Sequence, residues 1–388
     1  MATDNKNKVL NVPNLRFPEF KEVWKDSNIG RCFDLYSGNT PSRMEKEHFI
    51  GDVNWITSGE LKEHYIGDTK ERISEKAAAD NNLRILPIGT FVMAIYGLEA
   101  EGVRGTCSIT VKTSTISQAC MAFTPKSNVS NEFLYSWYKK HGNKIGIRYA
   151  QGTKQQNLSY DIIEKFPIIY PSIEEQEKLN TFISLLDSRI ATQNKIIEDL
   201  KKLKVAIRDK QLNAIRKHYG LNYQICDLLD YEQPTKYVVT DTEYSEDRSK
   251  TPVLTANKAF ILGYTDENFG VYDNGACIIL DDFTLDCKYV DFPFKVKSSA
   301  IKILTVKNSY SLRYVYEYLN YLNLETTEHK RHYISEIEPM IIAYPTDKKG
   351  IDDFNNIMSS FESKIEIENK YLQSLLTQKV YLLSNMFI

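Results

Sequence analysis

The sequence predicts an α+β fold in which two mixed α/β domains are joined by two long antiparallel helices that form a coiled coil. Three observations lead to this prediction. The chain repeats itself at an offset of about 175 residues. Each copy ends in a helical segment with heptad spacing. Each helical segment follows a region of short alternating apolar runs, which are typical of strands. The order is therefore domain, helix, domain, helix, with a pseudo-twofold internal repeat.

Apolar side chains recur every 3.5 residues on average in both helical segments, which indicates a coiled coil. Polar residues interrupt the two seams at equivalent places, Gln193 with Glu368 and Lys204 with Lys379. Two unrelated amphipathic helices would not be expected to share these interruptions. A single heptad helix cannot bury its own seam, so we expect the two helices to pair. The apolar seam is predicted to contain Leu179, Ile183, Leu186, Ile190, Ile197, Leu200, Phe354, Met358, Phe361, Ile365, Leu372 and Leu375.

We predict the first domain over residues 10–170 and the second over 221–345, with spacer helices over 171–220 and 346–388. About 35 helical residues span about 50 Å, which is about one and a half turns of B-DNA. Two similar domains held by such a rod predict a ligand with two sites at a fixed separation. Duplex DNA with two half-sites fits that description.

The composition is that of a folded chain, with 42% hydrophobic and 26% charged residues among 388. No apolar run is long enough to cross a membrane, and the N-terminus has no secretion signal, so we expect a cytoplasmic protein. The six cysteines have no metal-site spacing and are expected to be free thiols. The net charge of −2 means that any DNA binding must use local basic loops or a basic partner.

Six short motifs follow one another along the first half of the chain. They are NVPNLRFPEF (Asn11–Phe20), LYSGNTPSR (Leu35–Arg43), WITSGEL (Trp55–Leu61), ISQAC (Ile116–Cys120), QGTKQQNLS (Gln151–Ser159) and PSIEEQEKLNTFISLLDSRI (Pro171–Ile190). In this order and spacing they resemble the specificity subunit of bacterial type I restriction–modification systems. The second half departs from the pattern, and TPVLTANK (Thr251–Lys258) is the nearest counterpart of WITSGEL.

The resemblance implies that each domain reads one half of a bipartite, asymmetric target in double-stranded DNA, while the coiled coil sets the gap. It also implies two DNA adenine methyltransferase (modification) subunits as partners and, through them, two ATP-dependent restriction subunits that translocate DNA. S-adenosylmethionine, ATP and Mg are then expected on those partners, and no cofactor is expected in this chain. The sequence itself contains neither an Asn/Asp-Pro-Pro-Tyr/Phe methyltransferase loop nor a phosphate-binding G-x-x-x-x-G-K-[ST] loop, so we expect a non-enzymatic subunit.

Base readout and phosphate contacts require polar or basic side chains on loops that reach the grooves. Each candidate could equally be ordinary solvated surface. Those in the first domain are Thr40, Ser42, Arg43, Thr57, Ser58, Glu60, Tyr96, Arg104, Gln118, Arg148, Lys154, Gln155 and Gln156, and Glu60 could accept a hydrogen bond from a cytosine amine. Those in the second are Thr255, Asn257, Lys258, Lys288, Tyr289, Lys295, Lys297, Ser298, Ser299, Lys302, Arg331 and His332. The run from Lys295 to Ser299 is the strongest phosphate-binding candidate.

Two other functions stay open at this point. A two-headed coiled-coil scaffold that binds proteins would have the same domain order but no salt-dependent DNA binding. A stand-alone DNA nuclease, which is the less favoured reading, would need a metal cluster, for which Asp281, Asp282 and Asp286 are the candidates. A solvated acidic loop explains those aspartates more simply.

Overall fold

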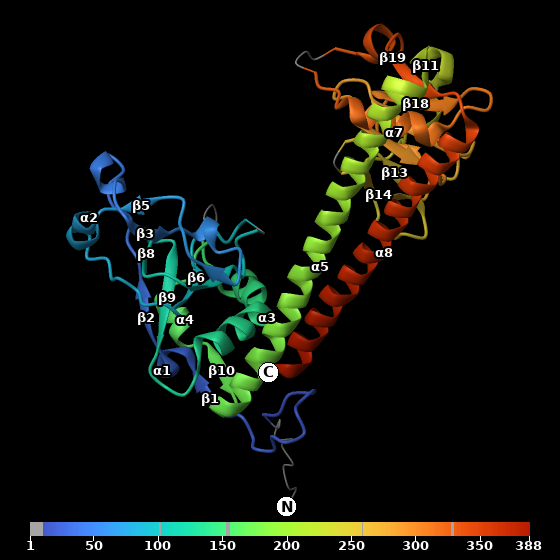
Figure 1. The fold of residues 1–388 in the computed structure, drawn as a ribbon. Coiled ribbons are helices and arrows are strands. Elements are labelled where there is room, and N and C mark those ends of the chain that lie inside the picture. The colour runs from blue at the N-terminus through green and yellow to red at the C-terminus, as the bar shows by residue number, and fades with distance from the viewer. Residues whose placement is uncertain (1–10, 101, 153–155, 258, 327–329) are drawn as a thin grey trace, which may run out of the picture. The chain divides into compact units, whose positions relative to one another are not determined.

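The computed structural model describes residues 11–388 apart from 101, 153–155, 258 and 327–329 (Figure 1). The chain divides into two compact units. Unit 1 runs to Gln193 and also includes 371–388, and unit 2 comprises 194–370. Each unit contains one mixed α/β domain together with a part of each of the two long helices. None of the helices in the described part of the chain is long and apolar enough to cross a membrane.

Unit 1 is built from two main sheets and a two-stranded ladder. The larger sheet has the order β2-β9-β6-β7-β4, the smaller has the order β5-β3-β8, and β1 pairs with β10. The strands are β1 (Lys25–Asn28), β2 (Phe33–Ser37), β3 (Val53–Ile56), β4 (Tyr65–Ile66), β5 (Arg72–Ile73), β6 (Phe91–Ala94), β7 (Cys107–Thr110), β8 (Ser114–Ile116), β9 (Cys120–Pro125) and β10 (Pro167–Tyr170). The helices of the domain are α1 (Ile29–Cys32), η1 (Lys46–Phe49), η2 (Ser58–Glu60), α2 (Glu75–Asp80), α3 (Asn131–Tyr149) and α4 (Tyr160–Glu164).

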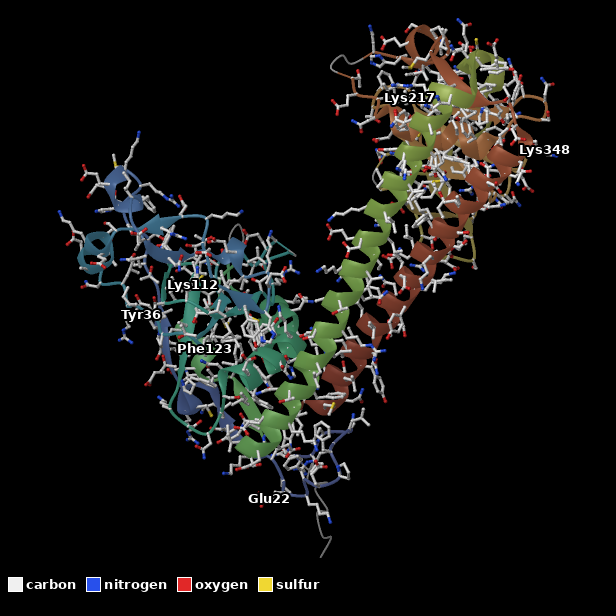
Figure 2. All side chains as sticks on the ribbon, viewed as in Figure 1. Glu22, Tyr36, Lys112, Phe123, Lys217 and Lys348 are labelled. Atoms are coloured by element: carbon white, nitrogen blue, oxygen red, sulfur yellow. The ribbon has the colours of Figure 1, made fainter. Side chains whose placement is uncertain are left out.

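Aromatic side chains fill the core between the larger sheet and α3. Ser130 caps α3 by accepting a hydrogen bond from the amide of Phe133 at 3.2 Å. The ring of Phe91 meets Phe123 edge to face at 5.2 Å and Tyr138 at 5.9 Å. Phe123, labelled in Figure 2, is 1% exposed. Burial of these rings fixes the sheet against the helix.

Unit 2 repeats this topology. Its larger sheet has the order β12-β18-β15-β16 and its smaller sheet β14-β13-β17, which match β2-β9-β6-β7 and β5-β3-β8 of unit 1, while β11 pairs with β19 as β1 does with β10. The strands are β11 (Gly220–Gln224), β12 (Leu229–Glu232), β13 (Thr251–Leu254), β14 (Ile261–Thr265), β15 (Cys277–Asp281), β16 (Cys287–Val290), β17 (Lys295–Val296), β18 (Ile301–Val306) and β19 (Ile341–Pro345). The helical segments are η3 (Ile215–Tyr219), α6 (Ile225–Leu228), η4 (Pro234–Tyr237), α7 (Leu312–Leu322) and η5 (Tyr333–Ile337). The predicted internal repeat is confirmed at the level of the fold.

The two long helices are α5 (Ile173–Ala214) and α8 (Lys348–Met386). Within unit 1 they run antiparallel and are joined by an ion pair between Lys379 and Asp187. Within unit 2 they again run antiparallel, and Lys204 binds Glu362 at 2.9 Å. At the offset of 175 residues, Lys204 corresponds to Lys379 and Glu362 corresponds to Asp187. The ion pair between the two helices is therefore repeated in both units. All of the predicted seam positions are buried or half-buried.

Candidate nucleic-acid interface

The carboxyl ends of β3 and β8 bring several predicted residues of unit 1 together. The two strands are parallel, with Ile56 opposite Ile116. Just beyond them the amide of Ser117 donates to the carbonyl of Ile56 at 2.9 Å. Thr57 and Ser58, which follow β3, therefore lie beside Gln118, which follows β8. All three side chains are half-buried or exposed.

Two further loops join at the same edge. The amide of Ile95, after β6, donates to the carbonyl of Ala119 at 2.9 Å, which brings Tyr96 beside the end of β8. The amide of Leu98 donates to the carbonyl of Gln156 at 3.0 Å. We call this cluster the unit 1 edge, and it consists of Thr57, Ser58, Tyr96, Gln118 and Gln156. Its hydroxyl and amide groups are those that read base edges.

The turn after β2 reaches the edge from the other side. The amide of Asn39 donates to the carbonyl of Ile116 at 3.2 Å, and Thr40 follows it. Gly38 is required there, because a Cβ would lie 1.9 Å from the carbonyl oxygen of Ile116. Ser42 is exposed further along the turn. The turn therefore places the Thr40 hydroxyl next to the edge, whereas Ser42 bonds only within its own turn among the bonds described.

Glu60 has a structural role in the loop that follows β3. Its carboxylate accepts hydrogen bonds from the amide of Thr57 at 2.9 Å, the hydroxyl of Thr57 at 2.7 Å and the amide of Lys70 at 2.7 Å. The Thr57–Glu60 spacing is that of a capping box, a signal already present in the sequence. These bonds show that Glu60 holds the loop, and its contact with a base stays a prediction. Lys70, which the sequence analysis missed, is exposed beside the loop as an additional cation.

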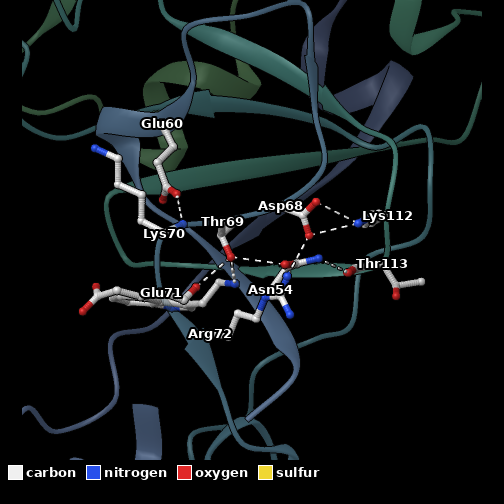
Figure 3. Close-up of polar contacts among 10 residues, drawn as sticks. Asn54, Glu60, Asp68, Thr69, Lys70, Glu71, Arg72, Lys112 and Thr113 are labelled. Carbon is white, nitrogen blue, oxygen red and sulfur yellow. Dashed lines mark hydrogen bonds and ion pairs between the residues drawn. The ribbon is translucent and has the colours of Figure 1, made fainter. Parts of the chain in front are cut away.

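The same loop is anchored to the sheet at its far end (Figure 3). The Thr69 hydroxyl donates to the carbonyl of Glu71 at 2.7 Å and accepts from the amide of Trp55 at 3.2 Å. Asp68 pairs with Arg72 at 2.8 Å and with Lys112 at 2.9 Å. Anchoring at both ends gives the loop a defined conformation, which a readout surface needs because it lowers the ordering cost of binding.

The three predicted arginines of unit 1 all contact other groups of the same unit. The guanidinium of Arg43 pairs with Glu71 and lies 4.4 Å over the ring of Phe49. This pairing lowers the pKa of Glu71 through a hydrogen bond. Arg104 donates to the carbonyl of Leu98 at 2.6 Å and so shapes a neighbouring loop. Arg148 lies on α3 and lines a separate apolar cavity. Of the other predicted residues, Lys154, Gln155 and Lys258 lie outside the described residues.

Unit 2 builds an equivalent edge from different side chains. Strands β13 and β17 are parallel, and the amide of Lys297 donates to the carbonyl of Leu254 at 3.0 Å, which matches the Ser117–Ile56 bond of unit 1. The amide of Asp282, after β15, donates to the carbonyl of Ala300 at 2.9 Å. The amide of His332, which follows Arg331, donates in turn to the carbonyl of Asp282 at 3.0 Å. We call this cluster the unit 2 edge, and it consists of Asn257, Lys297, Ser298, Ser299 and Arg331.

Four predicted contacts in unit 2 are wrong, because their side chains are buried. The ammonium of Lys295 is fully buried, pairs with Glu267 at 2.7 Å and donates to a backbone carbonyl. Although burial acts in the opposite direction, hydrogen bonds from Lys295 and Thr240 lower the pKa of Glu267 to about 2. The other three are Lys302, which is 1% exposed and pairs with Asp282 at 3.3 Å, His332, which contacts Glu336 at 2.9 Å, and Thr255, which is 7% exposed.

Lys288 and Tyr289 also lie apart from the unit 2 edge. They belong to β16, the outer strand of the larger sheet, and both are half-buried. The ring of Tyr289 packs on α7, where the guanidinium of Arg313 lies 4.3 Å from its centroid. Tyr289 therefore faces the helix that covers the sheet, and Lys288, its neighbour along the strand, points to the opposite face.

The aspartates that suggested a nuclease have structural partners. Asp281 accepts from the amides of Phe283 and Thr284 at 2.9 and 3.0 Å. Asp282 is 2% exposed and accepts from the amide of Tyr333 at 2.7 Å. Among the residues that the structure describes, no group of three or more His, Cys, Asp or Glu could hold a metal ion.

Comparison with known proteins gives one consistent family. Residues 21–202 match the family described as type I restriction modification DNA specificity domain. The chain is 48% identical over 125 residues to the specificity subunit of the EcoR124I/EcoR124II type I restriction enzyme of Escherichia coli, covering 31% of each chain. It is 30% identical over 228 residues to the MjaIX specificity subunit of Methanocaldococcus jannaschii, covering 58% of this chain and 51% of the relative. The alignments thus span a third to a half of these relatives.

Solved structures share the fold over nearly the whole chain. The S subunit of a type I restriction–modification system from M. genitalium superposes with a TM-score of 0.60 at 16% identity, covering 97% of this chain and 99% of the other. A chain solved to explain complex assembly and conformational transition of the type I R-M system gives 0.59 at 11% identity, covering 94% and 97%. At these identities the likeness concerns the fold alone.

Proposed function

Because the chain belongs to the family of type I restriction–modification specificity subunits, we propose that it is the non-catalytic subunit that recognises DNA for such a system. Each domain would read one part of a bipartite, asymmetric target. One observation carries the proposal: parallel strand pairs in both units end in matching edges that present polar side chains on anchored loops. The two edges share the same backbone arrangement but carry different side chains, as expected if they read two half-sites of different sequence.

We propose the same division of the chain as the sequence predicts. Residues 10–170 and 221–345 would be the two target-recognition domains, and residues 171–220 and 346–388 the spacer helices. In the first domain, Gln118, Gln156 and Ser58 would contact base edges. In the second, the cations at the unit 2 edge would contact phosphates or guanines, because lysine and arginine supply both kinds of contact.

The partners follow from the family. We propose that two DNA adenine methyltransferase subunits bind this chain and methylate one adenine in each half-site with S-adenosylmethionine. Two restriction subunits that use ATP and Mg would join through them for cleavage. The spacer helices would fix the number of unspecified base pairs between the half-sites. The chain would act in the cytoplasm, where it meets chromosomal and invading DNA.

The proposal is tested by mapping adenine methylation across the genome of cells that express this chain with a cognate modification subunit. We expect one new split motif, methylated on both strands across a fixed gap. Cells with the modification subunit alone are the control. A purified, folded complex that produces no new methylated motif would refute the recognition role, and a protein-binding scaffold would then be the better explanation.

A further inference from the structure

An N-terminal segment covers one end of the helix pair in unit 1. We call residues 11–24 the N-terminal strap. The guanidinium of Arg16 binds both carboxylate oxygens of Glu175 on α5, at 2.8 and 2.7 Å. Glu175 is only 2% exposed, so this ion pair is well shielded. The neighbouring ring of Phe17 meets Phe182 edge to face at 5.8 Å.

The strap also reaches the end of α8. The amide of Leu15 donates to the carbonyl of Asn385 at 2.9 Å. Lys178 forms an ion pair with Glu19 and lies 4.7 Å over the Phe17 ring. Arg16 and Phe17, a basic residue next to an aromatic one, thus pack on α5, and the preceding Leu15 contacts α8.

Unit 2 contains the corresponding surface without a strap. At the offset of 175, Glu175 and Lys178 of α5 correspond to Gly350 and Asp353 of α8. In unit 1 the strap precedes β1, whereas in unit 2 helix α5 continues through η3 directly into β11. Among the described residues of unit 2, no separate segment therefore precedes β11 as the strap precedes β1.

A cavity of about 300 Å³ lies at this position in unit 2. Its lining includes Gly350, Asp353, Phe354, Gln211 and Ile215. A Cβ on Gly350 would meet nothing closer than a carboxylate oxygen of Asp347 at 3.8 Å, so the space above this glycine is open.

The polar groups of the cavity are mainly hydrogen-bond acceptors. The side-chain oxygen of Gln211 is buried and has no hydrogen-bond partner, which is costly unless a donor arrives. Asp347 and Asp353 add two carboxylates, and the first already accepts from the amides of Lys349 and Gly350 at the start of α8. The remaining wall is apolar. Such a cavity favours a cationic donor next to an apolar side chain.

We propose that this cavity is a docking site for an extended peptide segment of a partner protein that carries a basic residue beside an apolar or aromatic one. The internal repeat supports this occupant, because the strap places Arg16 and Phe17 on the equivalent surface of unit 1. Charge complementarity supports it too, because Asp353 and the unpaired oxygen of Gln211 can accept hydrogen bonds from a basic side chain. The proposal concerns unit 2 alone and does not depend on DNA recognition.

The test uses a fluorescent peptide with the strap sequence, residues 11–24, added to the full chain and followed by fluorescence anisotropy. We expect it to bind the wild-type chain. Gly350→Phe, which fills the cavity, should weaken binding at least tenfold. Gly102→Phe is the matched control, because Gly102 has no atom within 4 Å of its Cβ position, and it should bind like wild type. Thermal melting followed by circular dichroism checks that both variants are folded.

A charge reversal guards against a Gly350 variant that fails to fold. Asp353→Lys should weaken the strap peptide, and a peptide with Arg16→Glu should bind this variant better than it binds wild type. Absence of binding to the wild-type chain overturns the proposal. Binding that neither Gly350→Phe nor Asp353→Lys weakens also overturns it, because the peptide would then occupy another surface, such as that of the native strap.

Discussion

Replacing Lys204 by methionine tests whether the interhelical ion pair of unit 2 stabilises its unit more than the equivalent ion pair of unit 1 does. In unit 2 Lys204 binds Glu362 at 2.9 Å and also Glu317 of α7 at 2.6 Å. Glu317 is 1% exposed, and burial raises the pKa of this carboxyl. In unit 1 the equivalent Lys379 binds only Asp187 among the pairs described, and both side chains are about a quarter exposed.

The two ion pairs differ in burial, and this difference sets the expected loss in the free energy of unfolding for each variant. Lys204→Met leaves the Glu317 carboxylate buried without its cation, and we expect a cost of about 2–4 kcal/mol, somewhat below that for breaking a fully buried pair because the lysine is 17% exposed. Lys379→Met breaks a more exposed pair and should cost about 0.5–1 kcal/mol. The internal repeat thus supplies the matched control.

Hydrogen–deuterium exchange of peptides from α7 and from the Leu179–Gln193 part of α5 measures each unit separately. An acid whose folded pKa is raised binds more protons in the folded state, so its contribution to stability falls as the pH rises from its unfolded pKa of 4.5 towards the folded value. The deficit of Lys204→Met should therefore shrink as the pH falls from 7 towards 4.5. The double variant Lys204→Met/Glu317→Leu should recover most of the loss. Equal losses of unfolding free energy for Lys204→Met and Lys379→Met would refute this reasoning. A double variant that is as unstable as Lys204→Met alone would also refute it.

Three further outcomes are expected. Gly38→Ala should lower the melting temperature of unit 1, with a cost of at least about 2 kcal/mol, because its Cβ would collide with the carbonyl of Ile116; an unchanged melting temperature would contradict the close approach. Lys297→Ala should reduce the slope of log affinity for DNA against log salt by about 1, whereas the buried Lys295→Met should destabilise unit 2 instead, and titrations over a salt series distinguish the two. Glu267, whose folded pKa is about 2, stabilises unit 2 above pH 4.5 and loses that effect as the pH falls towards 2, so Glu267→Gln should flatten acid unfolding in that range.

The long helices and the repeat could be predicted because their signals are local and periodic. Each seam position lies on one stripe of its own helix, so a count along the sequence finds it. Only one partner of each ion pair, Lys204–Glu362 and Lys379–Asp187, could be identified from the sequence. The repeated lysines stood out as polar interruptions, but their carboxylate partners lie on the other helix and depend on the antiparallel register.

The candidate site was harder to predict because strand faces depend on tertiary packing. Lys295 and Lys297 are two residues apart, yet Lys295 is fully buried in β17 while Lys297 is exposed just beyond its end. The buried ion pair with Glu267 bridges 28 positions along the chain, and no local pattern marks it. The edge itself forms because β13 and β17 meet in parallel, which is also a long-range event.

The side chains of the two edges favour different bases, which gives a last prediction. The unit 1 edge offers the amides of Gln118 and Gln156, and glutamine pairs with the N6 and N7 atoms of adenine. The unit 2 edge offers Lys297 and Arg331, and these side chains pair with O6 and N7 of guanine. We therefore expect the half-site read by the second domain to be richer in guanine on one strand. A methylation map in which Gln118→Ala relaxes one half of the motif and Arg331→Ala relaxes the other would support this assignment, and relaxation of the same half by both would contradict it.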